Sequence, residues 1–171
     1  MCIRDSAMAF EWPQVTWRET LGFFAKAIVS PIKPVMVATG PIKKEVATGP
    51  DANLFKYPWP YFCEGTGGRY SVMNDVIQKD PDSEWINWGN YRVMMLSRNK
   101  LTIAMQPGQQ GANLLYYKYE PRNMPMPTCI SVGGDPACFV AGGLYLPPGM
   151  NEVDVAGGLR GEPIELSLIH I

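Results

Sequence analysis

The feature that most constrains the fold is a series of short β-type segments joined by tight turns between residues 68 and 106. Strand-forming residues dominate the stretches "GRYSVMNDVIQ" (68–78), "WINWGNYRVMMLS" (85–97) and "KLTIAMQ" (100–106). The first two are separated by "KDPDSE" (79–84), whose Pro-Asp pair is typical of a turn. Strands joined by connections this short pair with antiparallel neighbours, so the sequence predicts an antiparallel sheet or barrel.

Helical patterns flank these strands. In "VTWRETLGFFAKAIVSP", Thr16 and Glu19 have the spacing of a capping box, and Pro31 ends the helix. Its expected buried face comprises Trp17, Leu21, Phe24 and Ile28. Further helices are predicted at 112–120, 136–144 and 151–159, an extended segment at 126–134 and a short strand at 43–48. The fold class is therefore mixed α and β, of the α+β type.

The loop "NLFKYPWPYFCEGTGG" (53–68) is rich in aromatic residues but has neither a helical nor a strand period. Packing of these rings against the protein is the favoured interpretation, with a partner-binding surface as the alternative.

The two ends of the chain share a property unrelated to folding. One short DNA word, read in its two orientations, encodes both "MCIRDS" (1–6) and "LSLIHI" (166–171). The word resembles a transposon end used as a sequencing adapter, so both hexapeptides are interpreted as translated adapter. On this interpretation Cys2 and the lone histidine, His170, carry no function, and the protein sequence between them is an internal fragment that we expect to be inactive alone.

Charge and cysteine usage exclude several classes of protein. The formal net charge is −1, with no basic stripe for nucleic acid. Cys63, Cys129 and Cys138 are an odd number without C-x-x-C spacing, which favours free thiols in a reducing compartment, with cytoplasm as the default. Every apolar run is too short to span a membrane. We therefore expect neither a nucleic-acid nor a membrane partner.

The stretch "NWGNYR" contains the polar residues that are best suited to binding or catalysis. Strand alternation places Asn87, Gly89 and Tyr91 on one face and Trp88, Asn90 and Arg92 on the other, unless a bulge near Gly89 intervenes. Asn87 offers a neutral oxygen ligand, Gly89 allows close approach to the backbone, and Arg92 offers a fork for a carboxylate or phosphate. Taken alone, the stretch also fits the solvated face of an ordinary strand.

A second candidate is "QPGQQG" (106–111), which ends a predicted strand and opens a predicted helix. Backbone N–H groups at such a junction can receive an anion, and Gln109 and Gln110 add amide groups. The loop matches no nucleotide-binding fingerprint, so an ordinary capped turn is the alternative. In "GGDPA", Asp135 is expected to cap a helix that begins at Pro136. Without His170, no histidine is left to activate a cysteine or serine nucleophile.

Several blocks, taken in order, resemble the UbiD family of decarboxylases. They are "DPDSEWINWGNYRVMM", "QPGQQG", "MPTCISVGGDPA" and "LPPGMNEVDVAGGLRGEPIEL", preceded by "TGPDANLFKYPWPYFCEGTGGRY". The resemblance covers most of residues 41–165, and its specificity comes from the order and spacing of the blocks. It implies reversible, non-oxidative decarboxylation of an aromatic or α,β-unsaturated acid with prenylated FMN held in a split β-barrel domain, in a protein that forms a homo-oligomer at full length.

The resemblance also assigns roles to residues. Asn87 corresponds to a ligand of Mn²⁺ or Mg²⁺, which bridges to the flavin phosphate, and the Trp88 carbonyl to a ligand of K⁺. Arg92 corresponds to the catalytic arginine, which holds the substrate carboxylate and couples to the acid that protonates the product. The neighbouring Gly89, Asn90 and Tyr91 are expected to contact the cofactor.

The second block departs from the family pattern. Many members have a metal-binding histidine where this chain has Gln110, after a glutamine that matches Gln109 and is expected to contact the cofactor. Glutamine still offers an oxygen to a hard cation, although the tightness of binding is put in doubt. Met105 aligns with an apolar position on the substrate side. The remaining metal carboxylate and both catalytic glutamates are expected to lie beyond this chain.

The resemblance divides the chain into four parts. Residues 1–6 and 166–171 are adapter, residues 7–68 end an N-terminal α/β domain and its connecting loop, and residues 69–165 form part of the split-barrel domain. Two other functions stay open. One is a non-catalytic flavin-binding or scaffold subunit of the same fold, which the glutamine at position 110 allows. The other is a flavin reductase on a split barrel.

Overall fold

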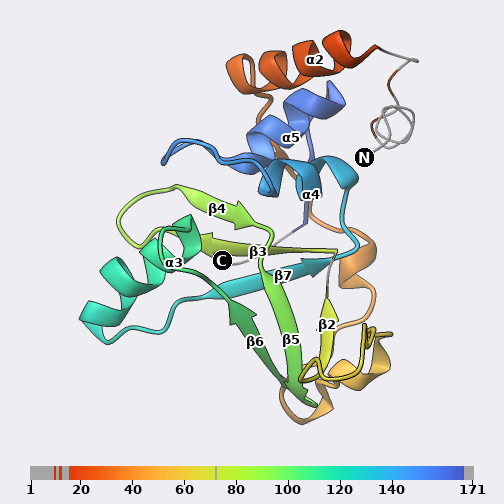
Figure 1. Ribbon diagram of the computed structural model, residues 1–171, viewed down its shortest axis with the longest axis vertical. Coiled ribbons are helices and arrows are strands. Elements are labelled where there is room, and N and C mark those ends of the chain that lie inside the picture. The colour runs from red at the N-terminus through yellow and green to blue at the C-terminus, as the bar shows by residue number, and fades with distance from the viewer. Residues whose placement is uncertain (1–9, 11, 13–15, 72, 168–171) are drawn as a thin grey trace.

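The computed structural model describes residues 10, 12, 16–71 and 73–167. Three layers follow one another along the molecule: helices α2, α5 and α4 at one end, a sheet of β4, β3 and β7 below them, and a second sheet of β2, β5 and β6 at the other end (Figure 1). The helices are α2 (Trp17–Val29), α3 (Gln110–Leu114), α4 (Pro136–Gly142) and α5 (Glu152–Arg160). Short 3-10 turns span Pro41–Lys43, Gly49–Asp51, Leu54–Lys56 and Glu120–Arg122.

The strands confirm the prediction of antiparallel β structure. One sheet has the order β4 (Ile86–Gly89), β3 (Asn74–Lys79), β7 (Thr128–Val132), and the other the order β2 (Arg69–Ser71), β5 (Arg92–Ser97), β6 (Lys100–Ala104). Every pairing within these two sheets is antiparallel. A short parallel pair joins β1 (Val35–Met36) to β8 (Glu165–Leu166). The described strands do not form a closed barrel, so the split-barrel arrangement stays a prediction.

Two segments predicted as single strands are each divided between the two sheets. The first breaks into β2 and β3, and the second into β4 and β5, so the chain crosses from sheet to sheet at Asn90 and Tyr91, directly after Gly89. Gly89 permits the second crossing, because a Cβ there would overlap the ring of Tyr91. The sequence period missed both breaks because strand-forming residues continue through them.

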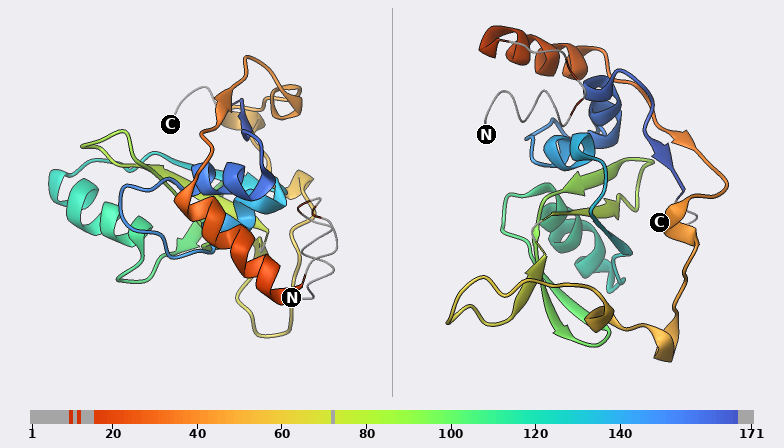
Figure 2. Two further views of the ribbon diagram at one scale, coloured as in Figure 1. Left: turned by 90° about the horizontal axis from the view of Figure 1, so that it is seen from above. Right: turned by 90° about the vertical axis from the view of Figure 1, so that its right-hand side faces the viewer.

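Helix α2 forms where the sequence predicted it, with the capping box of Thr16 and Glu19 in place. Its buried face was predicted in part: Phe24 and Ile28 pack against the core, whereas Trp17 and Leu21 are 61% and 50% exposed. Thr20 and Ala27 are buried in addition. The reason is the close approach of α5, where a Cβ on Gly158 would lie only 2.9 Å from the Cα of Ala27. Small residues at this crossing bring the two helices together (Figure 2). The large side chains of Trp17 and Leu21 stay outside the contact.

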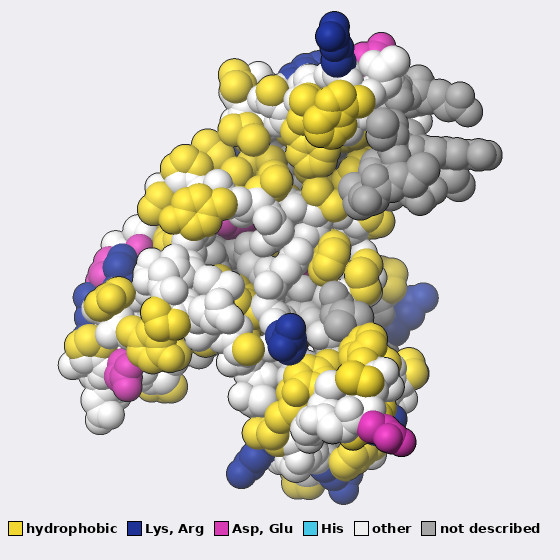
Figure 3. Space-filling model, viewed as in Figure 1, with side chains coloured by type: hydrophobic (Ala, Val, Ile, Leu, Met, Phe, Trp, Pro, Cys, Tyr) yellow, Lys and Arg dark blue, Asp and Glu magenta, His cyan; other side chains and the backbone are white. Residues whose placement is uncertain are grey.

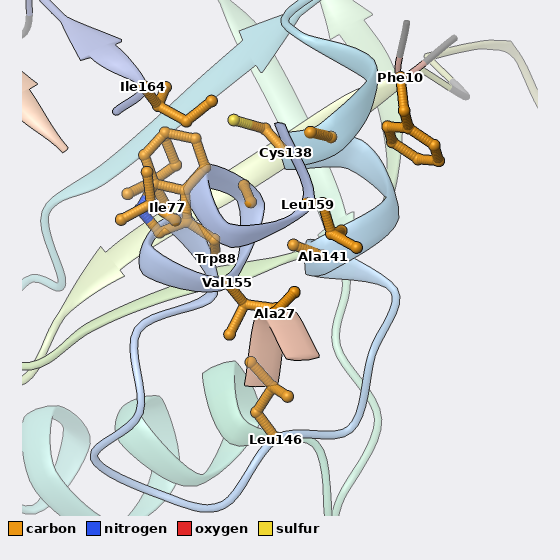
Figure 4. Close-up of a cluster of buried hydrophobic side chains, with 13 residues drawn as sticks. Phe10, Ala27, Ile77, Trp88, Cys138, Ala141, Leu146, Val155, Leu159 and Ile164 are labelled. Atoms are coloured by element: carbon orange, nitrogen blue, oxygen red, sulfur yellow. The ribbon is translucent and has the colours of Figure 1, made fainter. Parts of the chain in front are cut away.

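The main core lies between the helical layer and the sheet of β3, β4 and β7. Ile77 and Trp88 from the sheet pack with Cys138 and Ala141 from α4, and with Val155 and Leu159 from α5 (Figure 4). Burial of these apolar side chains is the main stabilising contribution to the domain. It also fixes strand β4 against the start of α5, which brings residues distant in sequence to one place.

Helix α3 continues as a π-helical segment (Leu115–Tyr119) into the last 3-10 turn. This helical run is attached to the turn between β3 and β4. The Lys118 ammonium lies 2.6 and 2.7 Å from the carboxylate oxygens of Asp80, and Arg122 forms a two-pronged contact with Asp82 at 2.8 and 3.0 Å. The turn predicted at 79–84 therefore also anchors a helical run through residues that lie 38 and 40 positions later in the sequence.

Two predictions in the N-terminal third are corrected. The strand expected at 43–48 is absent: residues 41–43 form a 3-10 turn, and the short strand lies earlier, in β1, where β8 supplies a partner. In the aromatic loop, the predicted packing of the rings holds for Trp59, which is buried and donates to the Leu54 carbonyl at 2.9 Å. Its neighbours Phe55, Tyr57, Tyr61 and Phe62 are all more than half exposed.

The predictions about the chain ends concern mostly undescribed residues. Cys2 and His170 lie outside the described residues, whereas Leu166 pairs with Met36. Cys63, Cys129 and Cys138 are free, as predicted. Among the described helices, none has the length and apolar character needed to cross a membrane.

Candidate functional site

An open pocket of about 210 Å³ lies where β4, the start of α3, the loop after α4 and the start of α5 meet. Its lining is mostly polar: Asn87, Trp88, Gly89, Asn90, Tyr91, Gly108, Gln109, Gln110, Gly142, Gly143, Leu144, Tyr145 and Glu152. In the space-filling view, polar side chains and backbone form the recess between the helical end and the lower sheet, with hydrophobic side chains on either side (Figure 3). The two sequence blocks singled out above thus form one site.

Asn87 is held in one orientation at the back of this pocket. Its side chain is 1% exposed, and its Nδ2 donates to Gln78 Oε1 at 2.9 Å and to the Tyr91 hydroxyl at 3.3 Å. Both contacts use the amide nitrogen, so the amide oxygen is left without a hydrogen-bond donor among the described residues. That oxygen is available to a cation.

Gln78 and Tyr91 are the residues that fix this amide. Gln78 is fully buried, and its own nitrogen donates to Met105 Sδ at 3.2 Å, which leaves its oxygen to accept from Asn87. The Tyr91 hydroxyl also accepts from the Gly111 amide at 3.0 Å, so it connects β4 to the start of α3. Gly111 must be glycine here, because a Cβ would lie 2.5 Å from Gln78 Oε1.

The two glutamines of "QPGQQG" have different roles. Gln109 Oε1 accepts from the Gln106 amide at 2.7 Å and closes the loop, with Gly108 at a φ of +93°. Gln110 Nε2 donates to the Leu146 carbonyl at 2.6 Å, so its oxygen, like that of Asn87, has no donor among the described residues. The helix start predicted to receive an anion is partly engaged, because the Gly111 amide already donates to Tyr91.

The residue that sequence reasoning missed is Glu152, the first residue of α5. It lines the pocket, is only 2% exposed and accepts from the Trp88 amide at 3.0 Å. Burial raises the pKa of this carboxyl to about 7. The expectation that the pocket's carboxylate lies beyond this chain is therefore corrected. The available signal was a glutamate in "NEVDVAGGL" whose neighbours Val153, Val155 and Ala156 are all apolar.

These three side chains make a donor set suited to a hard cation. Asn87 and Gln110 contribute neutral amide oxygens, and Glu152 contributes a carboxylate, which are the ligand types that Mg²⁺ and Mn²⁺ accept. Within the described part of the chain, no group of three or more His, Cys, Asp and Glu side chains is placed to hold a metal. The donor set of Asn87, Gln110 and Glu152 is of a different kind, because two of its three side chains are amides.

Arg92 and Met105 are not brought into the pocket. Arg92, the first residue of β5, pairs with Ala104 through its backbone, but its side chain is exposed and makes no hydrogen bond or ion pair with the described residues. Met105 packs beside the smaller core cluster that contains Val76 and Val93, and contacts Gln78 from behind. The other predicted residues of "NWGNYR" and "QPGQQG" all line the pocket.

Comparison with known proteins gives this geometry a family. Residues 33–170 match the domain described as 3-octaprenyl-4-hydroxybenzoate carboxy-lyase Rift-related domain, UbiD. The chain belongs to the UbiD family. Over 137 residues, 80% of this UbiD chain, it is 31% identical to pyrrole-2-carboxylic acid decarboxylase from Pseudomonas aeruginosa, of which the match covers 27%. The UbiD chain thus spans about a quarter of the length of that curated relative.

Solved structures of a UbiD-class enzyme share the fold. The enzyme HmfF from Pelotomaculum thermopropionicum in complex with FMN superposes with a TM-score of 0.86 at 25% identity, covering 96% of this chain and 36% of HmfF. An evolved dimeric form of HmfF in complex with prFMN gives a TM-score of 0.85 at 25% identity, covering 96% of this chain and 38% of HmfF. The mixed α and β fold predicted from the sequence is confirmed as that of UbiD-class enzymes.

Proposed function

We propose that this chain is the metal- and cofactor-binding part of a UbiD carboxy-lyase. The reaction is reversible, non-oxidative decarboxylation of an aromatic or α,β-unsaturated carboxylic acid with prenylated FMN. The observation that carries the proposal is the convergence of the Asn87, Gln110 and Glu152 oxygens in one pocket, although they lie 23 and 42 residues apart in sequence. The decarboxylases among the relatives and the flavin complexes among the solved structures support it.

The proposed metal is Mn²⁺ or Mg²⁺, and its protein ligands are these three oxygens. Gln78 and Tyr91 hold the Asn87 amide so that its oxygen faces the metal, and the Leu146 carbonyl does the same for Gln110. Held by these oxygens, the metal would neutralise the charge of the flavin phosphate, and the Trp88 carbonyl would be a ligand of K⁺. The remaining pocket residues Gly89, Asn90, Tyr91 and Gln109 surround the phosphate end of the cofactor.

Prenylated FMN, when bound, supplies the electron sink for the negative charge that departing CO₂ leaves behind. The residues of this chain bind and orient. The planar guanidinium of Arg92 offers two parallel donors to the substrate carboxylate, and its exposure leaves these donors available. We assign to it the additional role of coupling to the acid that protonates the product, and to Met105 an apolar position on the substrate side.

The remaining features of the proposal concern the whole protein. Residues 69–165 form part of a split-barrel domain that holds the flavin, and residues 7–68 end a preceding α/β domain. The intact enzyme is a cytoplasmic homo-oligomer that acts on a small carboxylic acid. The dimeric HmfF structure supports the oligomer by analogy.

A non-catalytic flavin-binding or scaffold subunit is the second candidate. Two observations favour it: Gln110 offers a weaker ligand than a histidine or carboxylate, and Arg92 has no acidic partner among the described residues.

One experiment separates the two functions. The full-length protein is produced with prenylated FMN and Mn²⁺, and CO₂ release is measured on a panel of aromatic and unsaturated acids. Turnover that disappears in Glu152→Gln supports the carboxy-lyase. Flavin and metal binding without turnover on any acid, and without exchange of labelled CO₂ into the carboxyl group of the acid, would instead establish the scaffold subunit.

A further inference from the structure

Strand β4 lies at the edge of its sheet, and helix α5 supplies acceptors to its open side. Among the described strands, β4 pairs with β3 alone, and its N–H groups alternate between the side that faces β3 and the open side. On the open side, the Ile86 N–H donates to Asn151 Oδ1 at 3.2 Å, and the Trp88 N–H donates to Glu152 Oε2 at 3.0 Å. Two consecutive side chains therefore take the place of a neighbouring strand.

Asn151 uses its side chain on the strand rather than on its own helix. It is the N-cap residue of α5, yet its side chain makes no hydrogen bond to the first turn of α5. The N-cap residues Thr16 of α2 and Asp135 of α4 both accept from amides of their helices. An N-cap asparagine normally stabilises its helix in that way, so the bond to Ile86 replaces a contact that the residue would otherwise make.

The two contacts with β4 are made by the residues on either side of Asn87. Asn151 and Glu152 are therefore attached to the strand directly before and directly after that asparagine. The register of α5 against β4 thus sets where the Glu152 carboxylate lies relative to the Asn87 amide. Metal affinity depends on this separation, because a hard cation requires its oxygen ligands at defined distances.

The Glu152 carboxylate needs its backbone to be held close to β4, since a glutamate side chain has several rotatable bonds and many rotamers. Two bonds hold that backbone. Asn151 supplies one through its amide oxygen, and the Trp85 indole N–H supplies the other by donating to the Met150 carbonyl at 3.1 Å. Residues 150–152 are thus all attached to the strand, and Asn151 is the middle one.

We propose that Asn151 is a positioning residue for the Glu152 carboxylate. Its amide oxygen accepts from the Ile86 N–H and so fixes the start of α5 beside Asn87. Asn151 does not line the pocket and is not itself one of the proposed ligands. The inference rests on the proposed function, because the carboxylate that it positions is one of the three proposed metal ligands. The attachment between α5 and β4 is independent of any metal.

The first test follows amide hydrogen exchange residue by residue in the metal-free full-length protein. In Asn151→Ala, Ile86 loses its acceptor and Trp88 loses a positioned one, so both N–H groups should exchange at least about tenfold faster than in wild type. The Asn90 N–H, which donates to the Gly142 carbonyl, should keep its wild-type rate. An unchanged rate at Trp88, or equal acceleration at Asn90, would overturn the proposal.

The second test measures the Mn²⁺ affinity of the full-length protein by electron paramagnetic resonance. Asn151→Ala should bind Mn²⁺ about tenfold more weakly than wild type, as expected when a residue that orients a ligand is removed. In a Glu152→Ala background, the same substitution should change the affinity by less than about twofold, because no carboxylate is left to position. Equal losses in the two backgrounds would show that Asn151 acts independently of Glu152, and would contradict the proposal.

Asn53→Ala is the matched control for both tests. Asn53 also accepts a backbone N–H with its amide oxygen, that of Phe55 at 3.1 Å, but it lies in the loop 53–68. Its removal should leave the exchange rate at Trp88 and the Mn²⁺ affinity unchanged. A loss of Mn²⁺ affinity as large as that of Asn151→Ala would mean that the effect is not specific to the start of α5.

The two measurements separate this inference from the proposed function. Wild type that binds no Mn²⁺ would remove the proposed divalent site, while the exchange rate at Trp88 would still decide whether Asn151 holds Glu152. Wild type and Asn151→Ala that bind Mn²⁺ equally well would leave the divalent site standing and remove only the positioning role.

Discussion

The two ends of the candidate site differ in how completely this chain builds them. At the metal end, Asn87 and Gln110 are each held by hydrogen bonds through their nitrogens, and Glu152 is buried against the Trp88 amide. At the other end, Arg92 is exposed and has no partner among the described residues. Positioned ligands lose little freedom on binding, whereas a free arginine must be ordered by its substrate or by other groups. The oxygens proposed to bind the metal are therefore preorganised, whereas the end proposed to bind the substrate carboxylate is left open.

The largest expected effect comes from removing Arg92 at the open end of the site. In the full-length enzyme, Arg92→Ala should lower decarboxylation by about 10³-fold, because the donors that hold the substrate carboxylate are lost. Flavin absorbance after purification should be unchanged, since Arg92 lies outside the pocket. Arg92→Lys keeps the charge without the fork and should recover part of the rate. Steady-state kinetics check this, and full turnover by Arg92→Ala would refute the assigned role.

At the metal end, Glu152→Gln removes the only carboxylate among the three proposed ligands while keeping its shape. Mn²⁺ affinity should fall about 100-fold, and flavin should be lost on gel filtration, because the proposed metal would neutralise the charge of the flavin phosphate. Asn87→Ala should weaken metal and flavin retention together. Isothermal titration with Mn²⁺ gives the affinity. Unchanged Mn²⁺ binding in both variants would show that Asn87 and Glu152 are not metal ligands.

The preorganisation itself is tested one step away from the ligands. Gln78→Leu deletes the oxygen that accepts from Asn87 Nδ2, so the amide can rotate and Mn²⁺ affinity should fall about 10–100-fold. Tyr91→Phe, which removes the weaker 3.3 Å contact, should have a smaller effect. Circular dichroism of each variant controls for folding. Equal Mn²⁺ affinity in all three proteins would mean that Asn87 needs no support.

The pH dependence of metal binding follows from Glu152. Its pKa of about 7 without metal lies above the ordinary 4.5, so below pH 7 the metal must displace a proton. Mn²⁺ affinity should fall by up to about tenfold per pH unit below 7 and level off above it. The stability of the metal-free protein changes with pH in the other direction. Without metal, the folded state holds the Glu152 proton more tightly than the unfolded chain does. Its contribution to stability is therefore complete below pH 4.5 and lost as the pH rises to about 7.

The smallest expected effect comes from restoring the ligand that many family members have. Gln110→His should raise metal affinity only several-fold for Mn²⁺ but more for Zn²⁺, because imidazole suits softer ions. Competition between the two metals measures the change in preference. A loss of Mn²⁺ binding in Gln110→His would show that the contact between Gln110 and the Leu146 carbonyl is needed in its present form.

Local patterns predicted local structure well. The capping box of α2, the Asp135 cap of α4, the turn at 79–84 and the strand that became β6 all depend on residues within a few positions of each other. The predictions that Trp17 and Leu21 of α2 are buried and that residues 43–48 form a strand were wrong, because each depends on what lies opposite. Trp17 stays exposed since α5 meets the helix at Ala27, and residues 43–48 have no neighbouring strand with which to pair.

The candidate site shows the same division. The order of the blocks predicted Asn87 and Gln110, and the family assignment drawn from them is confirmed. Glu152 was missed because a single glutamate at a helix start is an ordinary residue until its burial is known.

By itself, the sequence determined the alternation of strands and helices, the capping residues, the family and the two amides proposed as ligands, because these depend on near neighbours or on the order of motifs. Only the tertiary structure decided that two predicted strands divide between sheets and that Glu152 joins Asn87 and Gln110 in one pocket. Burial and convergence are set by contacts between segments far apart in the chain, and the cost of burying a charge arises only when those contacts form.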